Sequence, residues 1–416
     1  MILRRLLAGA IACSILLGVG SCSCAEEIEV RGRVFEDANL NWAYDGGEKL
    51  LGGVVVSDGE DVTATDRHGL YEIRTNPGSI VFVSVPGTHH APRNTYYGSV
   101  GKDSRDSKTL DFPLVPNSDL VDDGKFKFVF VSDTHAGRER SVLEITRAYT
   151  MVAGMNPPFV IHGGDVVDDA FRLSSEVDAR KQYEMYKNQL ASLIKAPFYH
   201  AVGNHDVFGW TVIPNERVPE RYGKEMFETY FGPAYYSFNY KHCHFVILDN
   251  IGRATTRSGE VFAFGQVTPE QIEWLKKDLS HVGGSRPIAL VTHIPTLGAF
   301  GVRYGLDGEV MPPPSDEKGL EGQDSDFPDT LDTVFKKCNL KLVLSGHQHV
   351  YRKIPWKMNE HDILFVMGGA ISGQWWKEDQ MITDSSSRRG FTEVSVDAQA
   401  FDATYIPYGQ QGVKER

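Results

Sequence analysis

The stretch "LSGHQHVY", residues Leu344–Tyr351, joins an apolar run to two histidines, His347 and His349, that are one residue apart. The apolar run predicts a buried strand, and Ser345-Gly346 predicts the turn that ends it. Such a turn can carry ordinary surface histidines, and on its own the stretch favours that interpretation. Neutral imidazole is, however, also the commonest metal-binding side chain. The ends of the other predicted strands therefore decide between the two interpretations.

Four further apolar runs also stop at residues that can bind metal. These are "FKFVFVS" before Asp133-Thr134-His135, "PFVIHGG" before Asp165, "PFYHAVG" before Asn204-His205-Asp206, and "RPIALVT" before His293. Helix-like segments such as 174–194 and 268–282 lie between the runs, which predicts α/β organisation. Ligands bind at the carboxyl ends of strands in open α/β sheets. Five such endings predict one assembled metal site better than five unrelated turns.

Taken together, these endings resemble the motif set of the calcineurin-like metallophosphoesterases, in the same order and at compatible spacing. The matching positions are Asp133-x-His135, Gly164-Asp165, Gly203-Asn204-His205-Asp206, His293 and Gly346-His347-x-His349. The resemblance covers roughly residues 126–370. It implies an α/β, four-layer metallophosphoesterase fold, in which two β-sheets flanked by helices carry a dinuclear metal centre.

The resemblance also implies a role for each residue of the motifs. Asp133, His135 and His349 would bind one metal ion, and Asn204, His293 and His347 would bind the second. Asp165 would bridge the two ions. His205 would be the catalytic residue outside the ligand shell, and Asp206 would orient or charge its imidazole.

The implied reaction is metal-dependent hydrolysis of phosphate esters, in which a metal-bound hydroxide attacks phosphorus and His205 protonates the leaving oxygen. Phosphomonoesters and phosphodiesters both remain open as substrates. An imidazole-rich shell suits two transition-metal ions such as Mn, Fe or Zn. Two divalent ions balanced by Asp133, Asp165 and a hydroxide leave a charge of about +1, which attracts phosphate.

Residues 26–116 predict a small all-β sandwich, because short alternating runs such as "EIEVRGRVF" are separated by turn residues. This region looks like the prealbumin-like domains of bacterial surface proteins. Within it, "DANLNWAYDGGE" has the oxygen-ligand spacing of a calcium loop. The five candidate ligands are Asp37, Asn39, Asn41, Asp45 and Glu48. Trp42 replaces the expected glycine, so a calcium site and a metal-free turn remain equally open.

Residues 1–25 predict a secretory signal peptide, because Arg4 and Arg5 precede the apolar run Leu6–Val19. The sequence up to Cys22 resembles a lipobox, which would leave a lipidated cysteine and a membrane anchor. Alternatively, Ser23-Cys24-Ala25 resembles an ordinary cleavage site, but the lipoprotein is the favoured prediction. We expect export to the periplasm or the cell surface. Residues 371–416 predict a short C-terminal β extension.

The formal net charge of −12 argues against nucleic acid as a partner. A small-molecule or envelope phosphate ester is the expected substrate. The contrasting hypothesis is a cell-envelope binding or scaffold protein with an inactive phosphoesterase domain. All seven predicted ligands are present, which favours the enzyme. His162 and His200 lie inside apolar runs and are predicted to be hydrogen-bonded core histidines.

Overall fold

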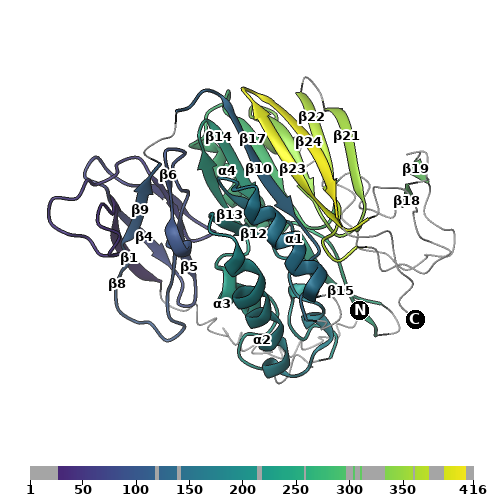
Figure 1. Cartoon of the computed structure of the whole chain (residues 1–416). Coiled ribbons are helices and arrows are strands. Elements are labelled where there is room, and N and C mark those ends of the chain that lie inside the picture. Colours follow the sequence, from purple (N-terminus) through teal and green to yellow (C-terminus); the bar gives the residue numbers. More distant parts are fainter. Residues whose placement is uncertain are drawn as a thin grey trace, which may run out of the picture.

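The chain folds into an N-terminal β region beside a larger α/β region (Figure 1). The computed structural model describes residues 27–117, 121–137, 142–212, 218–256, 259–296, 303–304, 310–311, 333–358, 361–373 and 388–408. The predicted signal peptide, Cys22 and most of the glycine- and proline-rich loop after Thr296 lie outside these described residues. No helix among the described residues is long and apolar enough to cross a membrane.

The N-terminal region consists of two small sheets whose apolar faces meet, as the alternating pattern predicts. In β4, for example, buried and exposed residues alternate along the whole strand. One sheet contains β1 (Ile28–Glu36), β4 (Leu70–Thr75), β6 (His89–His90), β8 (Lys108–Thr109) and β9 (Phe112–Pro116). The other contains β2 (Val55–Ser57), β3 (Val62–Ala64), β5 (Ile80–Val83) and β7 (Tyr97–Ser99).

The α/β region is built on two larger sheets. The first has the order β12 (Phe198–His200), β11 (Val160–His162), β10 (Lys125–Val131), β23 (Gly390–Asp397), β24 (Ala400–Pro407). The second has the order β13 (Tyr236–Tyr240), β14 (Cys243–Ile247), β17 (Pro287–Val291), β20 (Asn339–Ser345), β22 (His361–Gly368), β21 (Tyr351–Met358). Central strands such as β17 are buried along their whole length, which explains their continuous apolar sequence. The predicted C-terminal extension supplies β23, which pairs antiparallel with β10.

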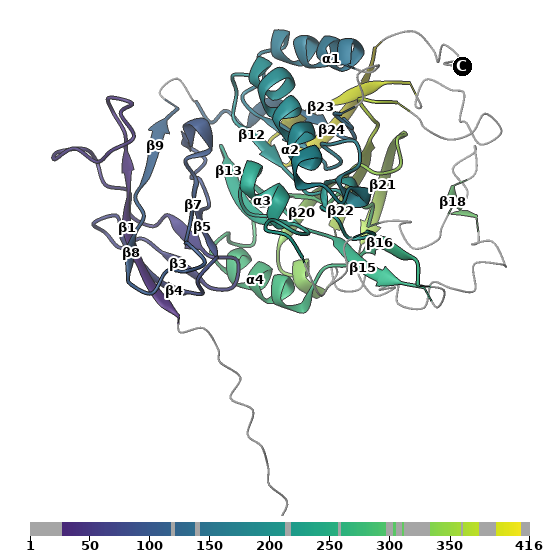
Figure 2. The ribbon, with the colours of Figure 1, turned by 90° about the horizontal axis from the view of Figure 1, so that it is seen from below.

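Helices cover the outer faces of these sheets (Figure 2). α1 (Val142–Gly154) and α2 (Glu176–Met185) lie on one side, and α4 (Pro269–Ser280) lies on the other. α3 is Glu225–Phe231, β15 (Ile251–Thr255) pairs with β16 (Val261–Gly265), and β18 (Arg303–Tyr304) pairs with β19 (Val310–Met311). α4 begins as its sequence predicts, since the Thr268 hydroxyl accepts from the Gln271 amide. The predicted four-layer fold with a preceding all-β region is confirmed.

The two regions share one hydrophobic core. Phe82 of the β region contacts Tyr236 and Trp274 of the α/β region, and the Trp274 indole donates to the Ser57 hydroxyl at 3.0 Å. The backbone after β5 also runs beside β13, where the Asn239 amide donates to the Val85 carbonyl at 2.8 Å. The β region is therefore packed against the second sheet through side-chain and backbone contacts.

Candidate metal centre

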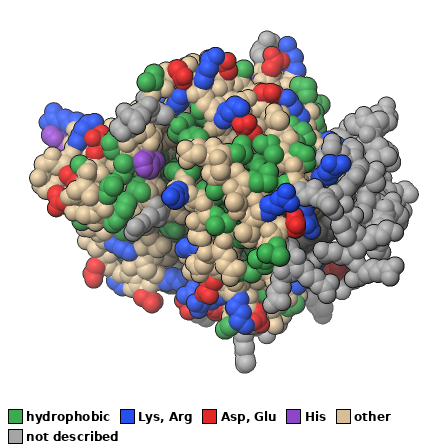
Figure 3. All heavy atoms as spheres, viewed as in Figure 1, with side chains coloured by type: hydrophobic (Ala, Val, Ile, Leu, Met, Phe, Trp, Pro, Cys, Tyr) green, Lys and Arg blue, Asp and Glu red, His purple; other side chains and the backbone are tan. Residues whose placement is uncertain are grey.

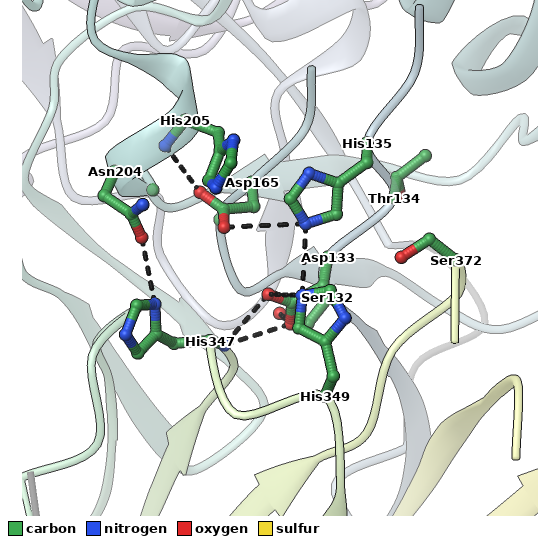
Figure 4. Close-up of polar contacts among 12 residues, drawn as sticks. Ser132, Asp133, Thr134, His135, Asp165, Asn204, His205, His347, His349 and Ser372 are labelled. Carbon is green, nitrogen blue, oxygen red and sulfur yellow. Dashed lines mark hydrogen bonds and ion pairs between the residues drawn. The ribbon is translucent and has the colours of Figure 1, made fainter. Parts of the chain in front are cut away.

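The structure brings all seven predicted metal ligands together at the carboxyl ends of five strands. They come from both central sheets: β10, β11 and β12 of the first, and β17 and β20 of the second. The labelled ligands in the close-up, which include Asp165, His135, His347 and His349, point toward one another (Figure 4). In strand order the seven ligands are Asp133, His135, Asp165, Asn204, His293, His347 and His349.

Two overlapping groups of ligand atoms occupy this point. Asp133, His135, Asp165 and His349 form one group, and Asp165, His293 and His347 form the other, with the atoms of each group within 4.8 Å of one another. Asn204 joins the second group, because its Oδ1 lies 3.0 Å from His293 Nε2 and 2.9 Å from His347 Nδ1.

Asp165 belongs to both groups through a single oxygen atom. Its Oδ2 lies 3.6 Å from His135 Nε2 and 3.2 Å from His293 Nε2. Its other oxygen, Oδ1, accepts the His205 backbone amide at 2.8 Å. The carboxylate is thus held with one oxygen between the two groups, which is where a bridging ligand must lie.

Backbone carbonyls fix the tautomers of three imidazoles in the centre. The Nδ1 atoms of His293 and His349 contact the carbonyls of Gly163 and Gly373 at 2.8 and 2.6 Å, and His135 Nδ1 lies 3.3 Å from the Asp168 carbonyl. A proton on Nδ1 leaves the Nε2 lone pair aimed into the centre. Accordingly, His135 Nε2 and His349 Nε2 face each other at 3.1 Å.

Five of the seven ligands have a left-handed backbone, with φ between 49° and 69°: Asp133, His135, Asp165, His347 and His349. This conformation costs a residue other than glycine roughly 1–3 kcal/mol and persists only where the surroundings enforce it. Here the loops bond to each other: the Asp133 amide donates to the Gly164 carbonyl, and the His135 amide donates to the Asp165 carbonyl, both at 3.0 Å.

Close backbone approach also requires the glycines beside the ligands. A Cβ on Gly203 would lie 2.2 Å from Asp165 Oδ1, and a Cβ on Gly346 would lie 1.9 Å from the Ser132 hydroxyl. Both contacts are shorter than atoms tolerate. The glycines of the sequence motifs are therefore explained by the packing of one ligand loop on another.

The centre perturbs the protonation of its own ligands. Burial favours a neutral His293, but the facing Asp165 carboxylate outweighs it and raises the pKa of His293 to about 9. Burial lowers the pKa of His347 to about 4, and the charge on His293 adds to this effect. Although burial opposes it, His293 and His205 hold the pKa of Asp165 well below its usual value. A metal ion bound here would displace the His293 proton.

His205 lies at the rim of the centre, and its imidazole Nδ1 contacts the Asp168 carbonyl at 2.7 Å. The prediction that Asp206 orients this imidazole is not what the structure shows. Asp206 is fully buried, and its two carboxylate oxygens accept the backbone amides of Val166, Val167 and Gly203 at 2.8 to 3.1 Å. Because its carboxylate is bonded to these amides, Asp206 connects the loop after β11 to the loop after β12 and does not contact the His205 imidazole through any of these bonds.

Sequence reasoning missed several residues that position the ligands. The Ser132 hydroxyl donates to Asp133 Oδ2 at 2.5 Å, and Asn250 Oδ1 accepts the backbone amides of His293 and Ile294 at 3.1 Å. Asp168 acts through its backbone carbonyl. No side-chain spacing in the sequence could reveal that role, whereas Ser132 does directly precede a ligand.

A buried chain of hydrogen bonds runs behind the centre. The Gly164 amide donates to His162 Nδ1, so His162 carries its proton on Nε2 and donates to the Thr134 hydroxyl at 2.9 Å. Thr134 is also 2.9 Å from the Tyr149 hydroxyl, and Tyr186 contacts His200 Nε2 at 2.9 Å. His162 and His200 are therefore hydrogen-bonded core histidines, as predicted, and His162 links two ligand loops.

The predicted calcium loop lies on the surface of the β region. Asn39 and Asn41 donate their side-chain amides to Asp45 Oδ2 at 2.7 and 2.8 Å, and Asp37 accepts the backbone amides of Asn41 and Trp42. The Glu48 carboxylate likewise accepts the amides of Ala38 and Asp45. Trp42 has a φ of 67°, the conformation that the expected glycine would adopt. The calcium site stays a prediction.

The residues of the centre fit two transition-metal ions. The set has four imidazoles, two carboxylates and one amide, and it is dominated by nitrogen. The carbonyl contacts that orient His135, His293 and His349 are the outer contacts that metal-binding histidines use.

Comparison with known families agrees with this geometry. The family model described as "Calcineurin-like phosphoesterase" matches residues 126–351, which is more than half of the chain. The model described as the "N terminal of Calcineurin-like phosphoesterase" matches residues 41–117. No curated protein matches the chain.

Several solved structures are similar at low identity. A dimetal phosphatase from Danio rerio is 11% identical with a TM-score of 0.43, covering 68% of this chain and 99% of that one. A predicted phosphoesterase from Streptococcus pneumoniae is 13% identical with a TM-score of 0.30, covering 68% and 90%. An anchor of the inner membrane complex of Plasmodium is 13% identical with a TM-score of 0.40, covering 70% and 87%.

Proposed function

Because the chain belongs to the calcineurin-like phosphoesterase family, we propose that it hydrolyses phosphate esters at a centre of two metal ions held by the seven ligands. One observation carries the proposal: the Asp165 Oδ2 atom faces the imidazoles of both ligand groups, His135 and His293. Two bound ions would supply an activated water and hold the phosphoryl oxygens. Manganese, iron and zinc suit the donor set.

The chain's own residues supply positioning and a proton. Asp133 and Asp165 are held by the backbone amides of His347 and His205, at 3.0 and 2.8 Å, so the carboxylates need not reorganise during the reaction. His205 has its Nδ1 fixed on a carbonyl, which directs Nε2 away from that contact. We assign to Nε2 the proton that the leaving oxygen receives.

The test is hydrolysis of a nitrophenyl phosphomonoester and a nitrophenyl phosphodiester by residues 26–416 reconstituted with manganese. The Asp165→Ala variant is the control and should lose bound metal together with activity, by at least about 10³-fold. Full activity in that variant, or activity that is independent of metal, would overturn the proposal. The preferred ester narrows the substrate class.

We also propose that the protein is exported and anchored through a lipidated Cys22. The support is sequence alone: Arg4 and Arg5, the apolar run Leu6–Val19, and the residues before Cys22. Mass spectrometry of the mature N-terminus from membranes tests it. An unmodified N-terminus at Glu26 would remove the anchor from the proposal and leave export.

A further inference from the structure

The peptide unit between Asp168 and Asp169 lies between His205, the proposed proton donor, and a ligand of the metal centre. The Asp168 carbonyl oxygen is 2.7 Å from His205 Nδ1 and 3.3 Å from His135 Nδ1. Because a carbonyl oxygen can only accept, both imidazoles must donate from Nδ1. The Asp169 carboxylate is 3.7 Å from His205 Nδ1, which is too far for a hydrogen bond. The orientation of two imidazoles thus depends on where a single carbonyl points.

The amide of the same peptide is bonded to α2. The Asp169 N–H donates to Gln182 Oε1 at 3.2 Å. Since a backbone amide can only donate, this contact also assigns the oxygen of the Gln182 side chain. The side chain is held from its other side by the loop after β10, where a Cβ on Gly137 would lie 2.9 Å from Gln182 Cδ. Gln182 is therefore an acceptor in a fixed place, between two loops that carry metal ligands.

Helix α2 is itself fixed against the loop that carries His205. Tyr183, which follows Gln182, is fully buried, and its hydroxyl donates to the Asp206 carbonyl at 2.5 Å. Its ring stacks on Tyr230 of α3, with 4.9 Å between the ring centroids. Two consecutive residues of α2 therefore bond to both loops that place His205: the loop after β11, whose carbonyl orients the imidazole, and the loop after β12, which carries it.

The outer face of α2 has a different character. Its side chains form ion pairs within the helix, Lys181 with Asp178 at 2.8 Å and Arg180 with Glu184 at 3.2 Å. Charged side chains of both signs lie over this part of the molecule in the space-filling view (Figure 3). Exposed ion pairs of this kind contribute little to stability. The inward face, and Gln182 in particular, is where α2 can act on the centre.

We infer that Gln182 is a positioning residue: it holds the peptide between Asp168 and Asp169 so that one carbonyl orients both His205 and His135. A hydrogen bond donated by the amide of this peptide also strengthens its carbonyl as an acceptor, because hydrogen bonds in a chain polarise one another. Gln182 acts through this peptide and not by contact with the substrate. The inference rests on the proposed function, since it concerns the proton that His205 gives to the leaving oxygen.

The first readout is NMR of the zinc-loaded protein with isotope-labelled histidine, which follows the exchange of each Nδ1 proton with water. Gln182→Leu and the unbranched Gln182→Met both remove the acceptor. In each variant, we expect the Nδ1 protons of His205 and His135 to exchange at least about tenfold faster than in the parent protein. The Nδ1 protons of His293 and His349, which other backbone carbonyls hold, are the internal reference and should not change.

Two further variants separate the hydrogen bond from packing. Gln182→Glu keeps an oxygen acceptor in the same place and should restore slow exchange. Gln189→Leu makes the same substitution at an exposed glutamine of the π-helical turn Tyr186–Leu190, just after α2, and should have no effect. Melting curves establish that each variant is folded.

Kinetics give the second readout. In Gln182→Leu, kcat for esters with poor leaving groups should fall about tenfold with little change in KM, because proton donation is impaired and binding is not. Nitrophenyl esters, whose leaving group needs no proton, should lose far less.

Unchanged exchange of the His205 and His135 protons in Gln182→Leu and Gln182→Met, or equally fast exchange in Gln182→Glu, would overturn the inference. A loss of kcat in Gln182→Leu that is equal across leaving groups, while His205→Ala discriminates among them, would also overturn it. The exchange measurement needs no substrate. It therefore decides on Gln182 even if the parent protein hydrolyses no ester, a result that would contradict the proposed function alone.

Discussion

Two parts of this molecule carry metal-ligand spacing in their sequence, and the structure treats them very differently. In the α/β region, the ligands Asp133, Asp165 and His293 are at most 1% exposed, and backbone contacts point their lone pairs at one another. In the β region, most of the loop 37–48 lies at the surface, although Asp37 is only 1% exposed, and its side-chain oxygens are already bonded to amides of the same loop. The spacing of the ligand residues predicts a metal site in both regions. Only in the α/β region are the ligand side chains already oriented for a metal ion.

The difference teaches what spacing leaves undecided. A ligand shell needs side chains that outer hydrogen bonds hold in place, so that lone pairs remain directed toward a common point. Left-handed backbone at five ligands of the α/β region shows that the fold maintains such an arrangement against local preference. The loop of the β region uses left-handed Leu40 and Trp42 to close a turn on itself. The following tests set these two regions against each other.

Among these tests, the largest effect is expected for His205 at the rim of the metal centre. His205→Ala should reduce turnover by about 10²- to 10⁴-fold on esters with poor leaving groups, because the leaving oxygen loses its proton donor. Esters with good leaving groups, such as nitrophenol, should lose far less. Rates for a series of leaving groups give the slope directly. Equal losses across the series would show that His205 is not the acid.

The second prediction concerns the buried support of the centre. Thr134→Val removes the hydroxyl that joins His162 and Tyr149 and keeps the shape of the side chain. Loss of a hydrogen bond made directly to a ligand typically costs 10- to 100-fold in metal affinity, whereas the Thr134 hydroxyl contacts His162 and Tyr149 and not a ligand. We therefore expect a loss of about tenfold or less by manganese titration, and near-normal affinity for the control Thr134→Ser. Unchanged metal affinity in Thr134→Val would show that the Thr134 hydroxyl does not help to position the ligands, and that their backbone hydrogen bonds are sufficient.

The strand ends of the α/β region could be predicted from sequence, because buried parallel strands are continuous apolar runs and a ligand stands directly after each. The orientation of the Asp206 carboxylate could not be predicted, because it is set by three backbone amides from two loops. The shared core of the two regions could not be predicted either. In it, Trp274 donates a hydrogen bond to Ser57, which is 217 residues away in the sequence. Contacts set by tertiary packing leave no local pattern.

A third, smaller effect is a pH dependence of stability that arises from Glu228, at the boundary of the two regions. There, Lys102 of the β region forms an ion pair with Glu225 of α3 at 2.7 Å. Burial, with Asp249 and Glu225, raises the pKa of the neighbouring Glu228 to about 7. The folded state then binds this proton more tightly than the unfolded state, so stability falls as pH rises from about 4.5 to 7.

Glu228→Gln removes this dependence. We expect the variant to be more stable than the parent by about 1–2 kcal/mol at pH 8 and nearly equal to it at pH 5, allowing for partial solvent screening of a half-buried group. Urea unfolding at both pH values measures the difference. If the variant differed from the parent by the same free energy of unfolding at both pH values, the difference would arise from packing and not from protonation of Glu228.

The smallest predicted effect is calcium binding at loop 37–48. Its carboxylates must first release the amides that they now accept, so any affinity should be in the weak range of extracellular modules, a Kd of about 1 mM. At 5 mM calcium, such a site stabilises the folded state by only about 1 kcal/mol. A rise in melting temperature that Asp45→Ala abolishes, and that magnesium does not reproduce, would make this loop a second metal site. An unchanged melting temperature would leave it a turn closed by its own hydrogen bonds, with the α/β region alone retaining a metal function.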